Sequence, residues 1–286
     1  MIKLYSLLAA CLLGLSVRAQ SSLPAPEIGV VVDMERDSLV KALQFKYMLE
    51  TTAKVLSPRE VSDAEFQERL QQIRELEVPL YGCNIFIPSD LKVVGPNVDE
   101  EAVLEYVEVV LRRAQVAGLT LITWGSGGSR RVPEGFDRVT ATAQFIYMAK
   151  RVAEVAARYD MLLVLENLNS SECNFITSIP EALAVVRAVD HPNFRLCVDI
   201  YHMLKDGQPA SDIVGTGPYA AYCEIAERDG RTPPGVQGTD FTPYLAAMKA
   251  EGYTGKIMIE ARWDDLATQG PAAYRTLRDQ IDAVYQ

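Results

Sequence analysis

Short apolar runs recur along the chain, and several of them end on an acidic residue. The run at residues 161–165 is apolar at every position and is followed by Glu166. Parallel strands that are covered by helices on both faces have this continuous apolar character. Three later runs, at 194–199, 219–224 and 256–260, are also mostly apolar and end on an acid. The pattern predicts parallel strands whose carboxyl ends carry acidic side chains.

Earlier apolar runs and the stretches between all the runs complete the pattern. Further strands are predicted at 28–33, 47–55, 78–87 and 119–124. Helices are predicted at 38–45, 63–76, 99–117, 140–159, 179–189 and 271–285. Residues 206–217 are rich in Gly and Pro and indicate a loop with a short helix. Because strands and helices alternate, we expect an α/β protein, a single-domain (β/α)8 TIM barrel, over residues 23–286.

Four acids are predicted to converge at one end of this barrel. Because the carboxyl ends of all barrel strands face the same way, the acids that end the last four strands share one rim. These acids are Glu166, Asp199, Glu224 and Glu260. Converging carboxylates repel each other unless a cation lies among them, so the pattern indicates a divalent metal.

Composition and charge narrow the classes of protein. The chain has 286 residues, of which 49% are hydrophobic and 23% charged, as is typical of a globular protein with a sizeable core. Its net charge is −10, from 28 basic and 38 acidic residues. Binding to nucleic acid depends on Lys and Arg that neutralise phosphates, so this balance argues against a nucleic-acid partner.

The first residues resemble an export signal. Lys3 is followed by an apolar stretch to Val17 and by the small residue Ala19, which predicts a signal peptide over residues 1–19. The stretch is too short for an ordinary membrane span, so we expect an exported protein, periplasmic or extracellular. An alternative is a lipoprotein processed at Cys11. The later cysteines are expected to be buried free thiols: Cys83, Cys173, Cys197 and Cys223.

An ordered set of motifs resembles a known family. The motifs lie at residues 125–136 (GSGGSRRVPEGF), 166–169 (ENLN), 172–174 (ECN), 199–202 (DIYH), 230–235 (GRTPPG) and 252–255 (GYTG). Together they resemble the xylose isomerase-like barrel superfamily, in the branch of sugar phosphate isomerases and epimerases. Ketose 3-epimerases and hydroxypyruvate isomerase belong to the same group.

The resemblance implies a site for manganese or magnesium. Glu166, Asp199 and Glu260 match three metal ligands of the family. The fourth position falls where the family commonly has a His-x-His pair, and this chain has Tyr222 and Glu224 there. A site made only of carboxylates suits magnesium, manganese or calcium better than zinc. Four carboxylates carry −4 against +2, so one of them is either protonated or unbound.

The resemblance also implies roles in catalysis. Glu166 and Glu260 would lie on opposite faces of a ketose, where one removes a proton beside the carbonyl and the other returns one. His202 and Glu172 match residues that orient the carbonyl end of the substrate. Arg231 matches an arginine that contacts substrate hydroxyls or the carboxylates.

Other residues near the strand ends have two interpretations each. Trp124 and Trp263 could stack on a sugar ring, although core packing explains both equally well. The glycines at 125–128, with Arg130 and Arg131, could bind a phosphate through backbone N–H groups. This segment lacks the Lys-Ser/Thr ending of a P-loop, and a flexible rim loop explains it equally well.

These observations predict an exported, metal-dependent isomerase or epimerase that acts on an unphosphorylated sugar or sugar derivative. One alternative is a lyase or hydratase that acts on keto-sugars or keto-glycosides, because the same enolate can expel a leaving group. Another is a carbohydrate-binding barrel without catalysis. A zinc endonuclease of related fold is disfavoured, because the chain has only two histidines.

Overall fold

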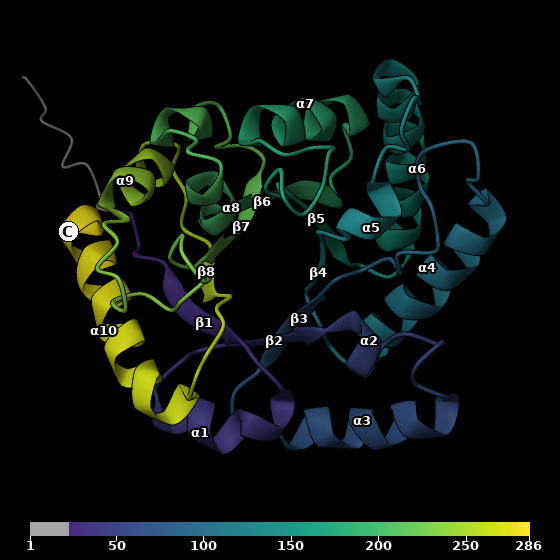
Figure 1. Cartoon of the computed structure of the whole chain (residues 1–286). Coiled ribbons are helices and arrows are strands. Elements are labelled where there is room, and N and C mark those ends of the chain that lie inside the picture. The colour runs from purple at the N-terminus through teal and green to yellow at the C-terminus, as the bar shows by residue number, and fades with distance from the viewer. Residues whose placement is uncertain (1–22) are drawn as a thin grey trace, which may run out of the picture.

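The computed structural model describes residues 23–286, which form a closed barrel of parallel strands surrounded by helices (Figure 1). The strands are β1 Glu27–Val31, β2 Met48–Thr51, β3 Leu80–Asn84, β4 Leu121–Trp124, β5 Leu162–Glu166, β6 Phe194–Asp199, β7 Ala220–Ile225 and β8 Lys256–Ile259. Each strand pairs with the next, and β8 closes the barrel on β1. The predicted (β/α)8 barrel is confirmed. The predicted signal peptide at 1–19 and Cys11 lie outside the described residues.

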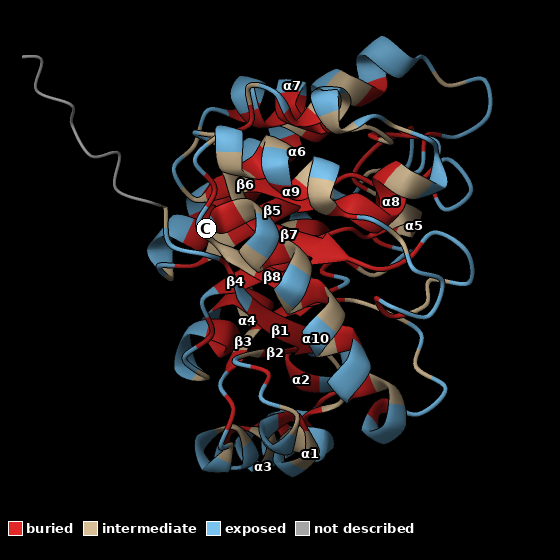
Figure 2. Cartoon of the chain, turned by 90° about the vertical axis from the view of Figure 1, so that its left-hand side faces the viewer, coloured by how far each residue is buried: buried red, intermediate tan, exposed pale blue. Residues whose placement is uncertain are grey.

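Helices connect successive strands and cover the outside of the barrel. They are α1 Asp37–Ala42, α2 Thr52–Val55, α3 Asp63–Glu75, α4 Glu100–Val116, α5 Gly127–Arg130, α6 Arg138–Arg158, α7 Ile179–Val189, α8 Ile200–Lys205, α9 Thr242–Ala250 and α10 Leu266–Tyr285. Short 3-10 helices are η1 Met34–Arg36 and η2 Ala210–Ile213. In Figure 2 the strands are buried and the outer faces of the helices are exposed. Within residues 23–286, no helix has the length and apolar character needed to cross a membrane.

Several local predictions differ from the structure. The strand predicted at 78–87 spans only Leu80–Asn84. The strand predicted at 47–55 ends at Thr51, and α2 begins at the next residue. The chain turns there because Glu50 Oε1 accepts a hydrogen bond from the Thr51 N–H at 2.8 Å, and the Thr52 hydroxyl donates to the carbonyl of Asn84 at 2.7 Å. Helix α8, directly after β6, was not predicted. The loop with a short helix predicted at 206–217 is confirmed by η2.

The interior of the barrel is filled by apolar side chains below the rim. Successive residues of a strand point to opposite faces, so every second residue faces inward. A separate hydrophobic cluster inside the barrel consists of Leu49, Leu121, Val164, Cys197, Tyr222 and Met258. This packed layer closes the barrel below the rim, and the residues two positions further along the strands form the layer above it.

Candidate active site

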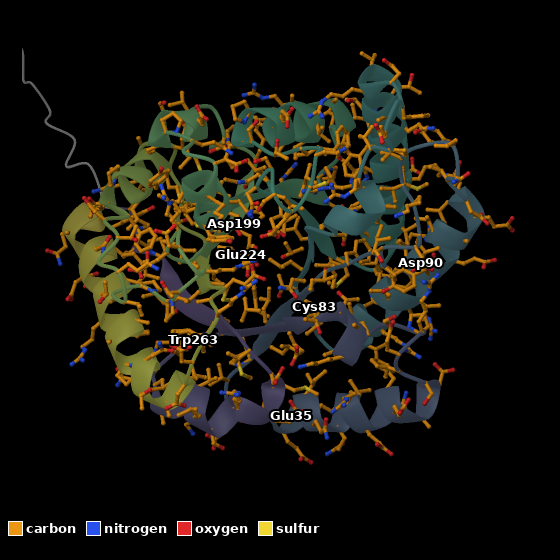
Figure 3. All side chains as sticks on the ribbon, in the orientation of Figure 1. Glu35, Cys83, Asp90, Asp199, Glu224 and Trp263 are labelled. Atoms are coloured by element: carbon orange, nitrogen blue, oxygen red, sulfur yellow. The ribbon has the colours of Figure 1, made fainter. Side chains whose placement is uncertain are left out.

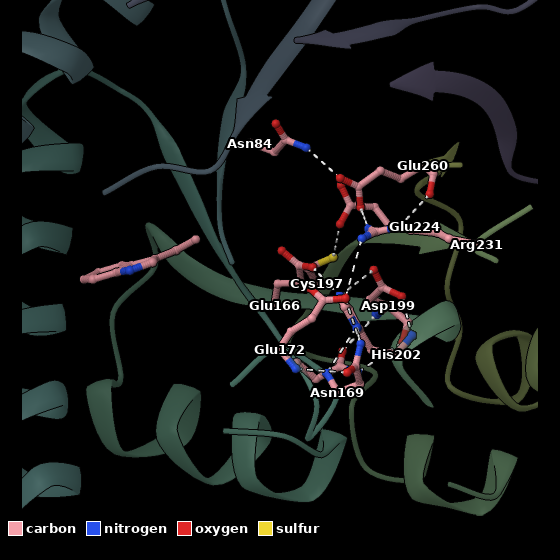
Figure 4. A network of polar contacts seen from close by, with 12 residues as sticks. Asn84, Glu166, Asn169, Glu172, Cys197, Asp199, His202, Glu224, Arg231 and Glu260 are labelled. Carbon is pink, nitrogen blue, oxygen red and sulfur yellow. Dashed lines mark hydrogen bonds and ion pairs between the residues drawn. The ribbon is translucent and has the colours of Figure 1, made fainter. Parts of the chain in front are cut away.

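Strand alternation brings the four predicted acids into one layer. Glu166, Asp199, Glu224 and Glu260 each lie two positions after an inward residue of the hydrophobic cluster in β5, β6, β7 and β8. They therefore point into the barrel directly above that layer. Each acid places one carboxylate oxygen within 4.8 Å of the oxygens of the other three. Figure 3 shows Asp199 and Glu224 near the middle of the barrel, and Figure 4 shows all four acids close together.

The carboxylate layer has the properties expected of a site for a hard cation. Asp199 Oδ2 and Glu224 Oε1 are buried and have no hydrogen-bond partner among residues 23–286. A buried carboxylate oxygen without a partner is costly, and a divalent cation would satisfy both oxygens. The possible ligands are oxygens, which suits magnesium, manganese or calcium. The residues present therefore fit a divalent metal.

Burial and mutual repulsion oppose the ionisation of these acids. Burial raises the pKa of Glu224 well above its usual value, and the neighbouring carboxylates raise it further. Burial also raises the pKa of Asp199. The pKa of Glu260 is raised by burial to about 7, although Arg231 lowers it. The charge balance of the site thus requires cations or protons, as expected for clustered carboxylates.

His202 contacts the carboxylates from the first turn of α8. Its Nε2 lies 3.1 Å from Glu166 Oε1. Its Nδ1 accepts the backbone N–H of Asn169 at 3.1 Å and faces the side-chain amide nitrogen of the same residue at 2.8 Å. That amide is oriented by its oxygen, which accepts the Ser171 N–H at 3.0 Å. Two donors at Nδ1 favour a neutral imidazole whose proton is on Nε2 and points at Glu166.

The negative charges near His202 favour the opposite protonation state. Burial lowers the pKa of His202, but Asp199 and Glu166 outweigh it and raise this pKa to about 9. A cation bound among the carboxylates would reduce this effect, whereas the two donors at Nδ1 would remain. We therefore take the neutral imidazole as the form that accompanies a filled cation site.

Glu260 is held from two sides. Asn84 Nδ2 donates to its Oε1 at 2.8 Å from the end of β3. On the other side, Arg231 forms an ion pair with the Glu260 carboxylate, and Arg231 Nε donates to the Glu260 carbonyl at 3.0 Å. Arg231 also lies 3.9 Å from Glu172. These contacts fix the orientation of Glu260 above the barrel (Figure 4).

A cavity of about 340 Å³ opens above the carboxylate layer. Its lining combines polar side chains of the site with glycines and two apolar side chains: Asn84, Ile85, Gly125, Ser126, Gly127, Gly128, Glu166, Leu168, Glu172, His202, Arg231 and Glu260. Its volume lies within the range of small-molecule sites in proteins. Five of the predicted site residues therefore share one cavity: Glu166, Glu172, His202, Arg231 and Glu260. Their catalytic roles stay predictions.

The two tryptophans lie elsewhere. Trp124 is fully buried and packs against Phe86, Phe145 and Phe194, with ring centroids 5.1–6.2 Å apart. Its predicted stacking on a sugar ring is therefore wrong, because its ring lies between the barrel and the helices. Trp263 is half-buried against the hydrophobic core and is not among the residues that line the cavity. Figure 3 shows it away from Asp199 and Glu224. Core packing explains both side chains.

The arginines beside the glycine-rich segment are engaged within the protein. Arg130 is fully buried and donates to the carbonyls of Trp124 at 3.1 Å and Glu166 at 2.7 Å. Arg131 donates to the carbonyl of Glu172. Neither guanidinium lines the cavity. The two arginines therefore do not provide cations for a phosphate bound there, which argues against a phosphate site at this segment. The glycines instead provide a wall that stands close to Glu166.

Some residues of the site were not predicted. Asn84 lies inside the strand predicted at 78–87, where the only signal is a lone polar residue before an apolar stretch. Asn169 belongs to the ENLN motif, from which no role is predicted for it, and it contacts both His202 and Glu172. Its contact with His202 spans 33 residues of sequence, and such a distance cannot be obtained from spacing alone.

Comparison with known proteins agrees with the fold and the motifs. Residues 39–283 match the family model of the xylose isomerase-like TIM barrel, so the chain belongs to this family. The chain is 29% identical over 170 residues to the human "Putative hydroxypyruvate isomerase", covering 56% of this chain and 60% of that protein. It is 31% identical over 120 residues to L-ribulose 3-epimerase of Methylomonas sp. (strain DH-1), covering 42% of each.

These matches are partial in sequence, whereas the structural match is nearly complete. The chain spans 42% to 60% of the length of these two curated relatives. The apo structure of 3-keto-D-glucoside 4-epimerase from E. coli superimposes with a TM-score of 0.73 at 19% identity, covering 89% of this chain and 99% of that one. At this identity, the structural match supports the fold alone.

Proposed function

We propose that this protein is a divalent-metal-dependent isomerase or epimerase that moves a proton beside the carbonyl of an unphosphorylated sugar or sugar derivative. The proposal depends on one observation: the carboxylates of Glu166, Asp199, Glu224 and Glu260 converge on one buried point at the base of a cavity. The names of the relatives, which include an L-ribulose 3-epimerase and a ketose 3-epimerase, support sugar chemistry. A barrel of this family gives the site its usual place at the strand ends.

The proposed cofactor is manganese or magnesium, bound among the four carboxylates, of which one would be protonated or unbound. When bound, such a cation supplies Lewis-acid stabilisation to the carbonyl oxygen where negative charge develops. That help is needed because a carbon acid beside a carbonyl is far weaker than a carboxylic acid. The oxygen ligands and the two unpartnered oxygens of Asp199 and Glu224 support this assignment.

The chain's own residues supply the proton transfers. Glu166 and Glu260 are proposed as the pair that removes and returns the proton. His202 donates to Glu166 Oε1 and so fixes which oxygen of that carboxylate is free to react. Arg231 and Asn84 hold Glu260 in place from opposite sides. Glu172, half-exposed at the cavity wall, is placed to contact substrate hydroxyls.

We also propose that residues 1–19 direct export, as the sequence predicts. The unphosphorylated substrate agrees with that location. It also agrees with the hydrogen bonds that the buried Arg130 and the exposed Arg131 donate to backbone carbonyls of the chain. The lipoprotein alternative at Cys11 predicts a lipid-modified amino terminus, which mass spectrometry of the mature protein would detect.

The decisive experiment is incubation with manganese and a panel of free and 3-keto sugars in deuterated water. Deuterium in recovered sugar supports the isomerase or epimerase. Release of the aglycone from a keto-glycoside would instead assign the site to a lyase. Ligand binding without either reaction, unchanged in Glu260→Gln, would favour a carbohydrate-binding barrel. Glu181→Gln, at the start of α7, serves as the matched control for Glu260→Gln.

A further inference from the structure

The loop that follows β7 is folded around one buried carboxylate. Glu227 is fully buried, and its side chain accepts hydrogen bonds from the Thr232 hydroxyl at 2.9 Å and from three backbone N–H groups. These belong to Gly235 at 2.9 Å, Gln237 at 2.6 Å and Thr239 at 3.1 Å. The Glu227 N–H in turn donates to the Thr232 carbonyl at 2.8 Å. A single side chain therefore closes the loop over residues 228–239.

Both oxygens of this carboxylate are fully used. Glu227 Oε1 accepts from Gly235 and Thr239, and its Oε2 accepts from Thr232 and Gln237. Glu227 does not line the cavity, and it is absent from the acidic groups that could hold a metal within residues 23–286. Its four donors are matched to an ionised carboxylate, which only accepts hydrogen bonds. A glutamine at this position would turn an amide N–H towards other N–H groups.

The same loop carries Arg231 to the cavity. Arg231 has a φ of 55°, a left-handed conformation that is disfavoured for a residue with a side chain. Its carbonyl accepts the Arg262 N–H at 2.8 Å, and its guanidinium lies 4.6 Å from the centre of the Tyr201 ring. The guanidinium then reaches Glu260, as described above. A disfavoured backbone conformation persists only where surrounding contacts enforce it, and the bonds to Glu227 surround it.

We propose that Glu227 is a positioning residue, which holds the loop after β7 so that Arg231 stays against Glu260. This inference rests on the proposed function, because Glu260 is one of the two proton-transfer carboxylates. Loss of the Glu227 carboxylate would release Arg231 and leave Glu260 without its cationic partner. The conformation of the loop at 228–239, outside the cavity, therefore controls the orientation of the Glu260 carboxylate inside it.

Backbone hydrogen exchange tests the anchor without any need for activity. In Glu227→Gln we expect exchange at the amides of Gly235, Gln237 and Thr239 to rise about tenfold or more, with the barrel strands unchanged. The Arg262 amide reports the position of Arg231 directly, because it donates to the Arg231 carbonyl, and it should also exchange faster. Unchanged protection of Arg262 would overturn the proposal, whatever the activity of the protein.

A matched control separates this effect from the general loss of a buried acid. Glu50, at the end of β2, is 3% exposed and accepts the N–H groups of Met34 and Thr51. Glu50→Gln should leave the loop at 228–239 and the Arg262 amide protected. If Glu227→Gln does not fold, Thr232→Val removes one of the four donors and should open the same amides to a smaller extent.

A double-mutant cycle tests whether Glu227 acts through Arg231. The rate of deuterium incorporation is measured for Glu227→Gln, for Arg231→Lys and for both together. If the effect passes through Arg231, the double variant is no slower than Arg231→Lys, whereas independent effects would multiply and contradict the coupling. If the wild type incorporates no deuterium with any sugar, the proposed function fails, and the Arg262 exchange still decides the anchor.

Discussion

His202 Nε2 lies 3.1 Å from Glu166 Oε1, although the two residues come from different strand ends. Asp199 creates this contact, because its Oδ1 accepts the His202 N–H at 2.9 Å and thereby begins α8 directly after β6. The first turn of that helix directs the imidazole at Glu166. The other oxygen of Asp199 has no hydrogen-bond partner among the described residues and lies 3.6 Å from His202 Nε2.

Replacement of His202 by Asn should slow catalysis without unfolding the protein. The shorter side chain does not reach Glu166, so the carboxylate loses the donor that orients it. Positioned proton-transfer groups contribute about 10²- to 10⁴-fold to the rate, and we expect a loss of kcat within this range. The measurement is the initial rate of deuterium incorporation into the sugar. His191→Asn, at the chain's other histidine, should retain the wild-type rate, and an equal loss there would contradict the role of His202.

Removal of divalent metal should make the stability of the protein fall as pH rises. The folded-state pKa of Glu260 is raised by burial from 4.5 to about 7. The folded state therefore favours the protonated form of Glu260. The contribution of Glu260 to the free energy of unfolding is complete below about pH 4.5 and is lost as pH rises through about 7. It amounts to at most about 3 kcal/mol, and water at the one-fifth-exposed side chain reduces it. Raised pKa values of Asp199 and Glu224 act in the same direction.

Added manganese should reverse this trend, because its ligands must be ionised. Melting temperatures between pH 5 and 8, with EDTA or with manganese, check both statements. In Glu260→Gln the metal-free protein should lose part of its pH dependence, because Asp199 and Glu224 still contribute in the same direction. Glu224→Gln should bind manganese more weakly by calorimetry. A wild type with the same melting temperature in EDTA and in manganese would contradict the cation site.

The sequence identified the barrel and the four acids for a physical reason. Apolar runs and helical stretches set the order of elements, and an acid at a strand end needs only the common direction of the strands to join the others. Side-chain direction is harder to predict in strands that are apolar on both faces. In such a strand, periodicity does not show which residues face inward. Trp124 is the last residue of such a strand, and it faces outward because Leu121, three positions earlier, faces the interior.

Trp124→Phe should therefore reduce stability and leave substrate affinity unchanged. The smaller ring leaves space between Phe86, Phe145 and Phe194, and we expect a loss of about 1 to 3 kcal/mol in the free energy of unfolding. Urea denaturation measures this loss, and KM for the sugar identified by deuterium exchange should stay at the wild-type value. A raised KM with unchanged stability would contradict this prediction and indicate that Trp124 contacts the substrate.

Contacts between loops were the second feature that spacing did not reveal. Asn169 donates a hydrogen bond to His202, and Asn84 donates one to Glu260. Glu227 accepts hydrogen bonds from the loop that follows β7. Each contact depends on the conformation of the loop that follows a strand. The same polar sequence is compatible with several loop conformations, so the sequence does not show which side chains meet. The helix α8 was missed for a related reason, since six residues give little periodicity.

Gly125→Ala should abolish most activity while the barrel stays folded. A Cβ atom at Gly125 would lie 2.0 Å from Glu166 Oε2, so the carboxylate must move away from the position that faces the other acids. A displacement of about 1 Å at a reacting group costs about 10²-fold in rate, and we expect a loss of at least this size. Deuterium incorporation and circular dichroism measure the two effects. Gly118→Ala provides the contrast, because its φ of 73° disfavours alanine but nothing lies within 4 Å of the added atom. It should lower stability and leave the rate unchanged, whereas wild-type activity in Gly125→Ala would show that Glu166 does not need its present position.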